Sequence, residues 1–295
     1  MKLKAFWCKC DGNAYKQVPL DHYETMSCPR PPIPIADCIG IMKSRRADKK
    51  HCDLNITITR TLTCPKQVVL EDEFEHVVKI EWLLSAYEGT VEHERWAKNA
   101  PLGWYTEVQA PVEGTPPVEL FGVPMKATID TLRADWSAIE EYKKHSESSQ
   151  NWKWKEVKEG TIDWETAAQV NGQRILLYKA TGHDVPHLYA WHAAMTSANG
   201  APNRIFVTLP RMTEDEILAV KPFGSKLTVR ENVASILRYK DHVKAGLSKE
   251  DAANRLPNAG ETMFVSKRHG TNKCDLYCAA RDWCDRVRGR QPRRI

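Results

Sequence analysis

The sequence predicts an α+β fold arranged in two domains. Its 295 residues, 42% of them hydrophobic, can bury a sizeable core, and the length allows one large domain or two ordinary ones. In residues 53–64, apolar and polar side chains alternate with the two-residue period of a half-buried strand. In residues 73–89, apolar side chains recur at helical spacing, and the pattern ends at Gly89. The N-terminal third therefore contains both a strand and a helix.

A proline-rich stretch divides the chain. Residues 110–119 contain three prolines and a glycine, a composition that favours an extended connector. We therefore predict an N-terminal mixed α/β domain over 1–109, a linker over 110–119 and a second α/β core over 120–212. The sequence indicates no role for the N-terminal domain.

Two patterns open the second core. Residues 129–139 carry apolar side chains at the spacing of an amphipathic helix. Residues 151–160 interleave two tryptophans with three lysines, which favours an edge strand whose tryptophans pack inward. The alternative is a surface on which the aromatic rings stack the bases of single-stranded nucleic acid.

A βαβ unit is predicted next. Residues 174–180 and 204–210 are short apolar runs typical of buried strands. Residues 186–200 between them begin with proline and end at glycine, as helices often do. Two strands that flank a helix indicate a parallel pair.

Residues 213–270 are predicted to be helical. Capping boxes mark three helix starts, in which a hydroxyl and a carboxylate three residues later satisfy each other's backbone donors. These pairs are Thr213 with Glu216, Thr228 with Glu231 and Ser248 with Asp251. The helix that begins at Ser248 and a further helix over 261–269 predict a helix-turn-helix. A helical hairpin that touches no DNA is the alternative.

The order of these elements resembles that of ParB-like proteins. The matching segments, within 174–268, are ILLYKATGHD, PHLYAWHAAM, RIFVTLP, MTEDEILAV, VRENV and GLSKEDAANRL. The turn lacks the paired arginines of that family's nucleotide-binding members. The resemblance therefore implies a DNA-binding architecture rather than a CTP site.

Positive charge is concentrated at the C-terminus. Residues 267–295 contain nine basic and three acidic side chains, a surplus of six, whereas the whole chain carries +5. Clustered Lys and Arg supply the sequence-independent attraction to DNA phosphates, although a solvated helix and tail over 271–295 explains the same charges. The residues expected to contact DNA are Arg255, Thr262, Ser266, Lys267, Arg268, Lys273, Arg281, Arg286 and Arg288.

An enzyme site is the alternative prediction. The junction between the predicted strand and the predicted helix contains Lys179, Thr181, Gly182 and His183. Free backbone N–H groups and the positive end of a helix dipole make such a junction suitable for phosphate, and an ordinary turn is the other interpretation. A phosphate- or nucleotide-handling activity would then be centred on residues 181–187.

The spacing of the cysteines does not decide whether the chain binds a metal ion. Cys8, Cys10, Cys28 and Cys38, with His22, supply the atom types of a tetrahedral zinc site. However, zinc-knuckle spacing is absent, and alternation along a strand would point Cys8 and Cys10 to opposite faces. We therefore assign no metal ligand and favour neither zinc nor a nucleotide as a cofactor.

The chain is expected to be cytoplasmic and to have no membrane partner. Its start lacks the apolar core of a signal peptide, no segment approaches the roughly 18 apolar residues of a membrane span, and its nine cysteines suit reduced thiols. We expect a DNA-binding regulator or a bacterial or phage DNA-maintenance factor. A protein-interaction module is a third possibility, and the sequence does not indicate an oligomeric state.

Overall fold

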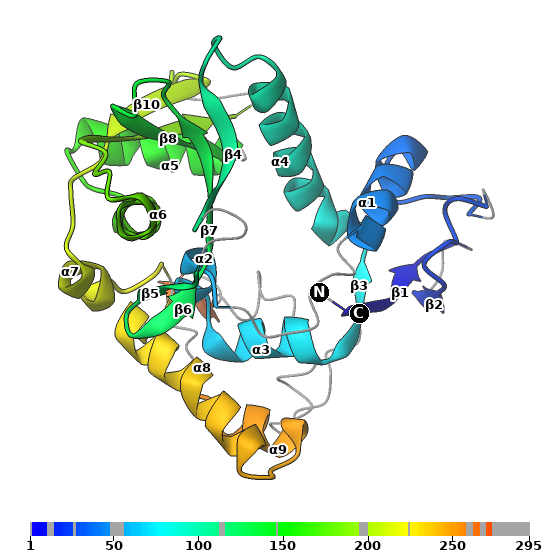
Figure 1. The fold of residues 1–295 in the computed structure, drawn as a ribbon. Helices are drawn as coiled ribbons and strands as arrows, with labels where there is room; N and C mark the ends of the chain where they lie inside the picture. Colours follow the sequence, from blue (N-terminus) through cyan, green and yellow to red (C-terminus); the bar gives the residue numbers. More distant parts are fainter. Residues whose placement is uncertain are drawn as a thin grey trace.

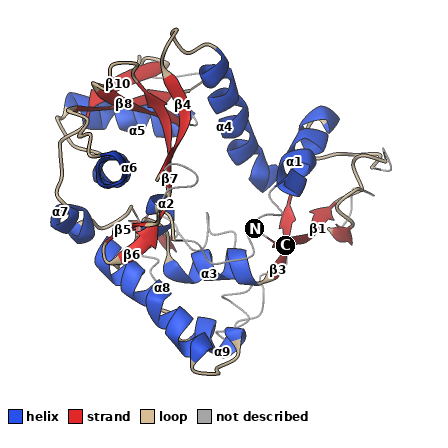
Figure 2. Cartoon of the chain, in the orientation of Figure 1, coloured by secondary structure: helices blue, strands red, loops and turns tan. Residues whose placement is uncertain are grey.

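Helices and strands are mixed in the computed structural model of the chain, which confirms the α+β fold class (Figure 1). Its strands form a five-stranded sheet, a three-stranded sheet and two hairpins, with helices packed around them (Figure 2). The described residues are 2–10, 15–25, 28–47, 56–111, 116–145, 147–194, 200–223, 225–257, 262–265 and 270–272.

The five-stranded sheet is the centre of the larger part of the molecule. Its strands are β4 (Tyr105–Ala110), β7 (Ala127–Leu132), β8 (Ala138–Lys144), β9 (His187–Ala193) and β10 (Arg204–Thr208). Their order is β10-β9-β8-β7-β4, with β8 and β9 parallel and the other neighbours antiparallel. Because a parallel pair needs a long crossover, the chain between β8 and β9 forms α5 (Glu147–Lys158) and α6 (Trp164–Thr181).

The βαβ unit predicted over 174–210 is wrong in its first two elements. Residues 174–180, predicted as a strand, are the last turns of α6, and residues 187–193, predicted as helical, form β9. The strand predicted over 204–210 is confirmed as β10. Most of α6 is buried, so the helix lacks the one-sided apolar stripe by which a surface helix is recognised.

Two other predictions in this region are wrong. Residues 129–139, predicted as a helix, contain the end of β7, a turn and the start of β8. The apparent helical spacing arises because both strands and Trp136, in the turn at φ 59°, contribute apolar side chains. Of residues 151–160, predicted as an edge strand, 151–158 belong to α5 and the last two form a turn.

The N-terminal predictions are also displaced. Residues 73–89 contain β3 (Glu75–Lys79) before α4 (Glu81–Lys98) begins. In the predicted strand over 53–64, the first three residues lie outside the described ranges, and the rest includes the short helix α2 (Ile58–Thr61).

A smaller unit lies at the N-terminus. Its sheet consists of β2 (Lys16–Val18), β1 (Lys2–Cys8) and β3, in that order, with β1 parallel to β3. Helix α1 (Ile35–Ala47) and the start of α4 cover it (Figure 1). The buried side chains between these elements are Phe6, Cys8, Val18, Tyr23, Cys28, Cys38, Ile41, Met42, Ile80 and Leu83.

The remaining helices share one core with the five-stranded sheet. They are α2, α3 (Pro65–Glu73), α7 (Glu214–Ala219), α8 (Val229–Lys244) and α9 (Lys249–Asn254). The capping boxes at Thr213 and Thr228 are confirmed, and the Ser248 side chain accepts the Asp251 N–H at the start of α9. Asn232 of α8 is buried and donates to the Thr61 carbonyl at 2.9 Å, which ties α8 to α2.

The third helix predicted over 261–269 is wrong. The described residues of this stretch form β11 (Thr262–Val265), which pairs with β12 (Gly270–Asn272). Phe264 and Val265 are aromatic and β-branched residues, which favour extended backbone. In the described part of the chain, α8 and α9 are therefore followed by a hairpin and not by a recognition helix.

The predicted linker, 110–119, begins and ends in strands, and residues 112–115 lie outside the described ranges. β4 ends at Ala110 and belongs to the same sheet as β7, so the five-stranded sheet crosses the predicted domain boundary. The hairpin of β5 (Val118–Leu120) and β6 (Val123–Met125) follows. None of the described helices is both long and apolar enough to span a membrane.

Gly172→Ala is expected to destabilise the protein by about 1–3 kcal/mol. Gly172 lies on α6 where a Cβ would overlap Cγ1 and Cδ1 of the buried Ile58. Helix propensity alone would make the same substitution stabilising by about 1 kcal/mol. Gly89→Ala in α4 is the matched control, because nothing lies within 4 Å of its added Cβ. Urea unfolding checks both, and equal stabilisation of the two variants would contradict the close contact between α6 and α2.

Candidate active site

A row of three carboxylates crosses the five-stranded sheet. The pairs on either side of Glu107 in β4 and Asp130 in β7 place these two residues opposite each other. The register of β7 with β8, continued by one residue, places Glu141 opposite Asp130. Ligand atoms of Glu107 and Asp130 lie within 4.8 Å of each other, and the charges of Glu107 and Glu141 both raise the pKa of Asp130. Neighbouring strands therefore bring the three acids close together.

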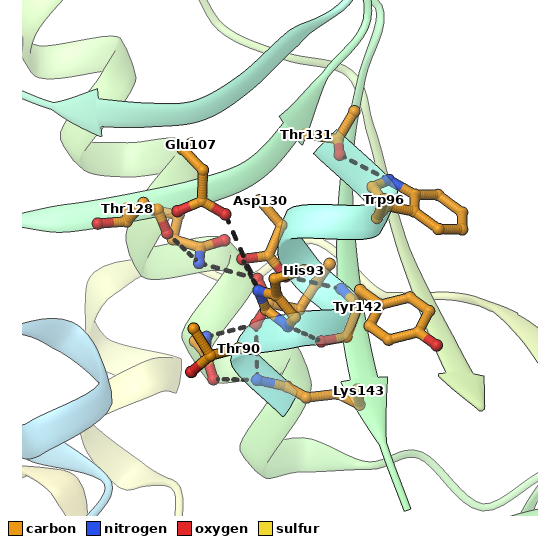
Figure 3. A network of polar contacts seen from close by, with 12 residues as sticks. Thr90, His93, Trp96, Glu107, Thr128, Asp130, Thr131, Tyr142 and Lys143 are labelled. Carbon is orange, nitrogen blue, oxygen red and sulfur yellow. Dashed lines mark hydrogen bonds and ion pairs between the residues drawn. The ribbon is translucent and has the colours of Figure 1, made fainter. Parts of the chain in front are cut away.

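The strands separate at this row. Backbone pairing between β7 and β8 ends at Thr131, and beyond it the carboxylate of Asp130 accepts the Tyr142 N–H at 2.8 Å. The Tyr142 carbonyl lies 3.2 Å from Nε2 of His93, on α4. Side chains thus replace the missing backbone partners, and they fix Asp130 and His93 in position (Figure 3).

The imidazole of His93 faces two carboxylates. A carbonyl only accepts hydrogen bonds, so Nε2 carries a hydrogen, and in the neutral form of the ring, which is the form that binds metals, Nδ1 presents a lone pair. Nδ1 lies 3.5 Å from Asp130 Oδ1 and 3.9 Å from Glu107 Oε1. The ligand atoms of the three residues all lie within 4.8 Å of one another. Three electron-rich groups converge on one point, which suits a bound cation.

Burial and like charge perturb these acids. Burial raises the pKa of Asp130 well above its ordinary value, the charge of Glu141 raises it further, and the Tyr142 N–H and Lys143 oppose the shift. Burial also raises the pKa of Glu107, and His93 opposes that shift. A divalent cation at this point would offset the repulsion and hold both acids in the ionised form.

Glu141 lies in a network of side-chain donors. Its Oε1 accepts from Lys143 Nζ and from Gln169 Nε2, both at 2.6 Å, and its Oε2 accepts from Gln173 Nε2 at 3.0 Å. Burial lowers the pKa of Lys143, but Glu141 and Asp130 raise it by more, so the net shift is upward. Lys143 is therefore an ammonium ion at neutral pH.

Two helices hold the site from opposite faces of the sheet. Gln169 and Gln173 are one turn apart on α6, and both reach Glu141. Successive strand residues alternate in direction, so Tyr142 points away from α6, and its ring lies 5.2 Å from the ring of Trp96 on α4. Trp96 also donates to Thr131 Oγ1 at 3.0 Å, which anchors α4 beside His93.

Glu107 has an unusual backbone conformation. Its φ is +52°, in the left-handed region that residues other than glycine seldom occupy. Such conformations cost free energy and concentrate at functional sites. The strain falls on one of the three residues that surround the candidate cation position.

The phosphate site predicted at residues 181–187 is at the C-terminus of a helix and not at the N-terminus of one. Gly182 caps the C-terminus of α6, at φ 76°, and β9 follows, so the expected strand-to-helix junction is a helix-to-strand junction. A helix C-terminus presents carbonyl groups and partial negative charge. Lys179 forms an ion pair with Glu214 at 2.5 Å, Thr181 donates to the Leu177 carbonyl, and the His183 ring packs edge-on against Trp136.

The predicted DNA contacts are described only in part. Arg255 is exposed at the C-terminal cap of α9, and Thr262 lies in β11. The others lie outside the described residues: Ser266, Lys267, Arg268, Lys273, Arg281, Arg286 and Arg288. None of the predicted site residues belongs to the cluster around His93.

Comparisons with known proteins identify no family. No family model matches the chain, and no curated protein matches it. Among solved structures, the chain is similar to a protein named SSO0001, with 16% sequence identity, 71% of this chain and 86% of that chain covered, and a TM-score of 0.38. A likeness this weak carries no argument, so function has to be argued from the site.

Proposed function

We propose that the chain is a divalent-metal-dependent nuclease that hydrolyses phosphodiester bonds in DNA. The observation that carries this proposal is the convergence of His93, Glu107 and Asp130, together with the ion pair between the buried Glu141 and the partly exposed Lys143. Carboxylate oxygens with one imidazole suit Mg²⁺ or Mn²⁺. The proposal keeps the phosphate chemistry of the enzyme alternative predicted from the sequence, but it assigns that chemistry to a different part of the fold.

The residues of the site would have separate roles in hydrolysis. Asp130, Glu107 and His93 would hold the cation, which lowers the pKa of bound water and polarises a phosphoryl oxygen. In hydrolysis the water oxygen bonds to phosphorus, the bond to the leaving oxygen breaks, the water loses a proton and the leaving oxygen gains one. Negative charge grows on the phosphoryl oxygens, and the Lys143 ammonium group, held by Glu141, would stabilise it.

Glu141 sets the protonation state and the orientation of Lys143. Its carboxylate keeps the lysine protonated and fixes the direction of its Nζ, with Gln169 as a second acceptor at 2.8 Å. Because the pKa of Lys143 is raised, the lysine serves as a donor and not as a general base. Gln169 and Gln173 position Glu141 in turn.

Support for DNA as the substrate comes from the sequence. The surplus of six positive charges in residues 267–295 provides attraction to a polyanion. Arg255 adds an exposed cation at the end of α9. A divalent cation and an ammonium group would both stabilise the charge that develops when a phosphodiester is hydrolysed.

Cleavage of DNA should depend on metal. Incubated with end-labelled duplex or single-stranded DNA, the full-length protein is expected to produce shorter products in Mg²⁺ or Mn²⁺ and none in EDTA, with activity restored by excess Mg²⁺. Denaturing gels measure the products. Cleavage that persists unchanged in EDTA would overturn the metal-dependent reaction. Binding of DNA that stays intact in both metals would leave a DNA-binding protein and remove the nuclease.

A further inference from the structure

A second cluster of metal-ligand side chains lies in the N-terminal unit. The ligand atoms of Cys8, Cys10, His22 and Cys28 all lie within 4.8 Å of one another. Cys8 Sγ is 3.4 Å from Cys28 Sγ, and Cys10 Sγ is 3.1 Å from His22 Nε2. A tetrahedral zinc ion with bonds of about 2.3 Å to sulfur and 2.0 Å to nitrogen separates its ligand atoms by roughly 3.5–3.8 Å. The four side chains already approximate that arrangement.

The geometric objection from the sequence does not hold. Alternation would point Cys8 and Cys10 to opposite faces only if both were in one strand. β1 ends at Cys8, and Cys10 lies in the turn that follows. The chain therefore leaves the extended conformation between them, and both sulfurs point to the same place. Cys38 was an equal candidate from the sequence, but it is not in this cluster.

We propose that Cys8, Cys10, His22 and Cys28 bind a structural zinc ion. Three sulfurs and one imidazole nitrogen form a complete tetrahedral set, with no position left open for a substrate. The ligands come from three separate places in the unit: the end of β1, the turn at residues 19–25 and the segment before α1. Zinc would therefore cross-link parts of the chain that are far apart in sequence.

The small core of the unit favours a structural metal. Only ten residues are buried in its described core, and three of them are cysteines. Small units with such cores are commonly stabilised by a metal.

This proposal is independent of the nuclease proposal, because the two clusters share no ligand. The test is the metal content of the full-length protein purified without chelator from zinc-supplemented culture. We expect about one zinc per chain in the wild type and a loss of at least half in Cys10→Ser. Cys10 is chosen because it is only partly buried, so its substitution disturbs packing least.

Cys38→Ser is the matched control. Cys38 is buried in the same core, and its thiol donates to the Ile33 carbonyl instead. The variant should keep its zinc. If Cys10→Ser does not fold, cobalt substitution of the wild type decides, since cobalt bound to thiolates in a tetrahedral site gives strong visible absorption.

Five results would overturn the zinc site. Four are less than a tenth of an equivalent of zinc in the wild type, iron in its place, a Cys8–Cys28 disulfide found by mass spectrometry, and zinc lost from Cys38→Ser but kept by Cys10→Ser. The fifth is a cobalt derivative without the tetrahedral thiolate spectrum.

Discussion

Asp130→Asn is expected to lower the rate of DNA cleavage by roughly 10³-fold or more, equivalent to about 4 kcal/mol in the activation barrier. The carboxylate is the buried member of the His93–Glu107–Asp130 set, and its replacement removes both a ligand atom and a negative charge. Folding should survive, because an asparagine oxygen can still accept the Tyr142 N–H. Rates are measured under single-turnover conditions in Mg²⁺.

The stability of this variant separates a catalytic role from a structural one. The pKa of Asp130 is raised in the folded state, so the ionised carboxylate costs stability above that pKa. Without metal at pH 8, Asp130→Asn should melt at the same temperature as the wild type or higher. Asp135→Asn is the control, since Asp135 is in the exposed turn between β7 and β8 and should keep activity within about twofold. Equal activity of Asp130→Asn and wild type would remove Asp130 from the reaction.

Lys143→Met is expected to lower the cleavage rate by about 10²–10³-fold, the loss typical of one donor to a developing negative charge. Its ammonium group lies between Glu141 and Gln169, and its charge opposes the raised pKa of Asp130. Metal affinity should be largely unchanged, because Lys143 is not a ligand. A loss of rate with retained Mn²⁺ binding is the result that a purely structural lysine would not give.

Lys144→Met provides the matched control on the same strand. Lys144 points to the opposite face of β8 and forms an ion pair with Glu88 of α4 at 2.8 Å. Its replacement removes a partly exposed ion pair, which costs about 1 kcal/mol or less. Activity near that of the wild type is expected at temperatures where the variant is folded. If both lysine variants lose activity equally, the assignment of Lys143 to the reaction is wrong.

The fold class could be predicted from the sequence, but several elements could not. The capping boxes at Thr213 and Thr228 depend on local hydrogen bonds, and they identify helix starts correctly. Periodicity failed in α6 because most of that helix is buried, so it has no one-sided apolar stripe. In β9, buried and less buried residues do alternate, but the less buried Tyr189 and Trp191 are aromatic, so the sequence does not alternate between apolar and polar residues. The helix predicted over 129–139 combined residues from two strands into one false pattern.

That error also concealed the candidate site. The predicted helix contains Asp130 and ends before Glu141 and Lys143, which are separated by one residue and so share one face of the strand that the structure shows. Once the stretch is known to be β7 and β8, the acid in ATIDTL and the Glu-x-Lys in AIEEYKK point to adjacent positions in a sheet. His93 and Glu107 come from other elements, and only the folded chain brings them to Asp130.

Direct detection of the bound metal tests the central claim. Crystals grown with Mn²⁺ are expected to show an anomalous peak about 2.0–2.3 Å from Asp130 Oδ1 and His93 Nδ1, with Glu107 beside it. Occupancy should fall as the crystals are moved from pH 8 to acid, because protonation of Asp130, whose pKa is raised, competes with the metal. A peak between these side chains that weakens with acid is the predicted result. A map without density there at saturating Mn²⁺ and pH 8 would contradict the account.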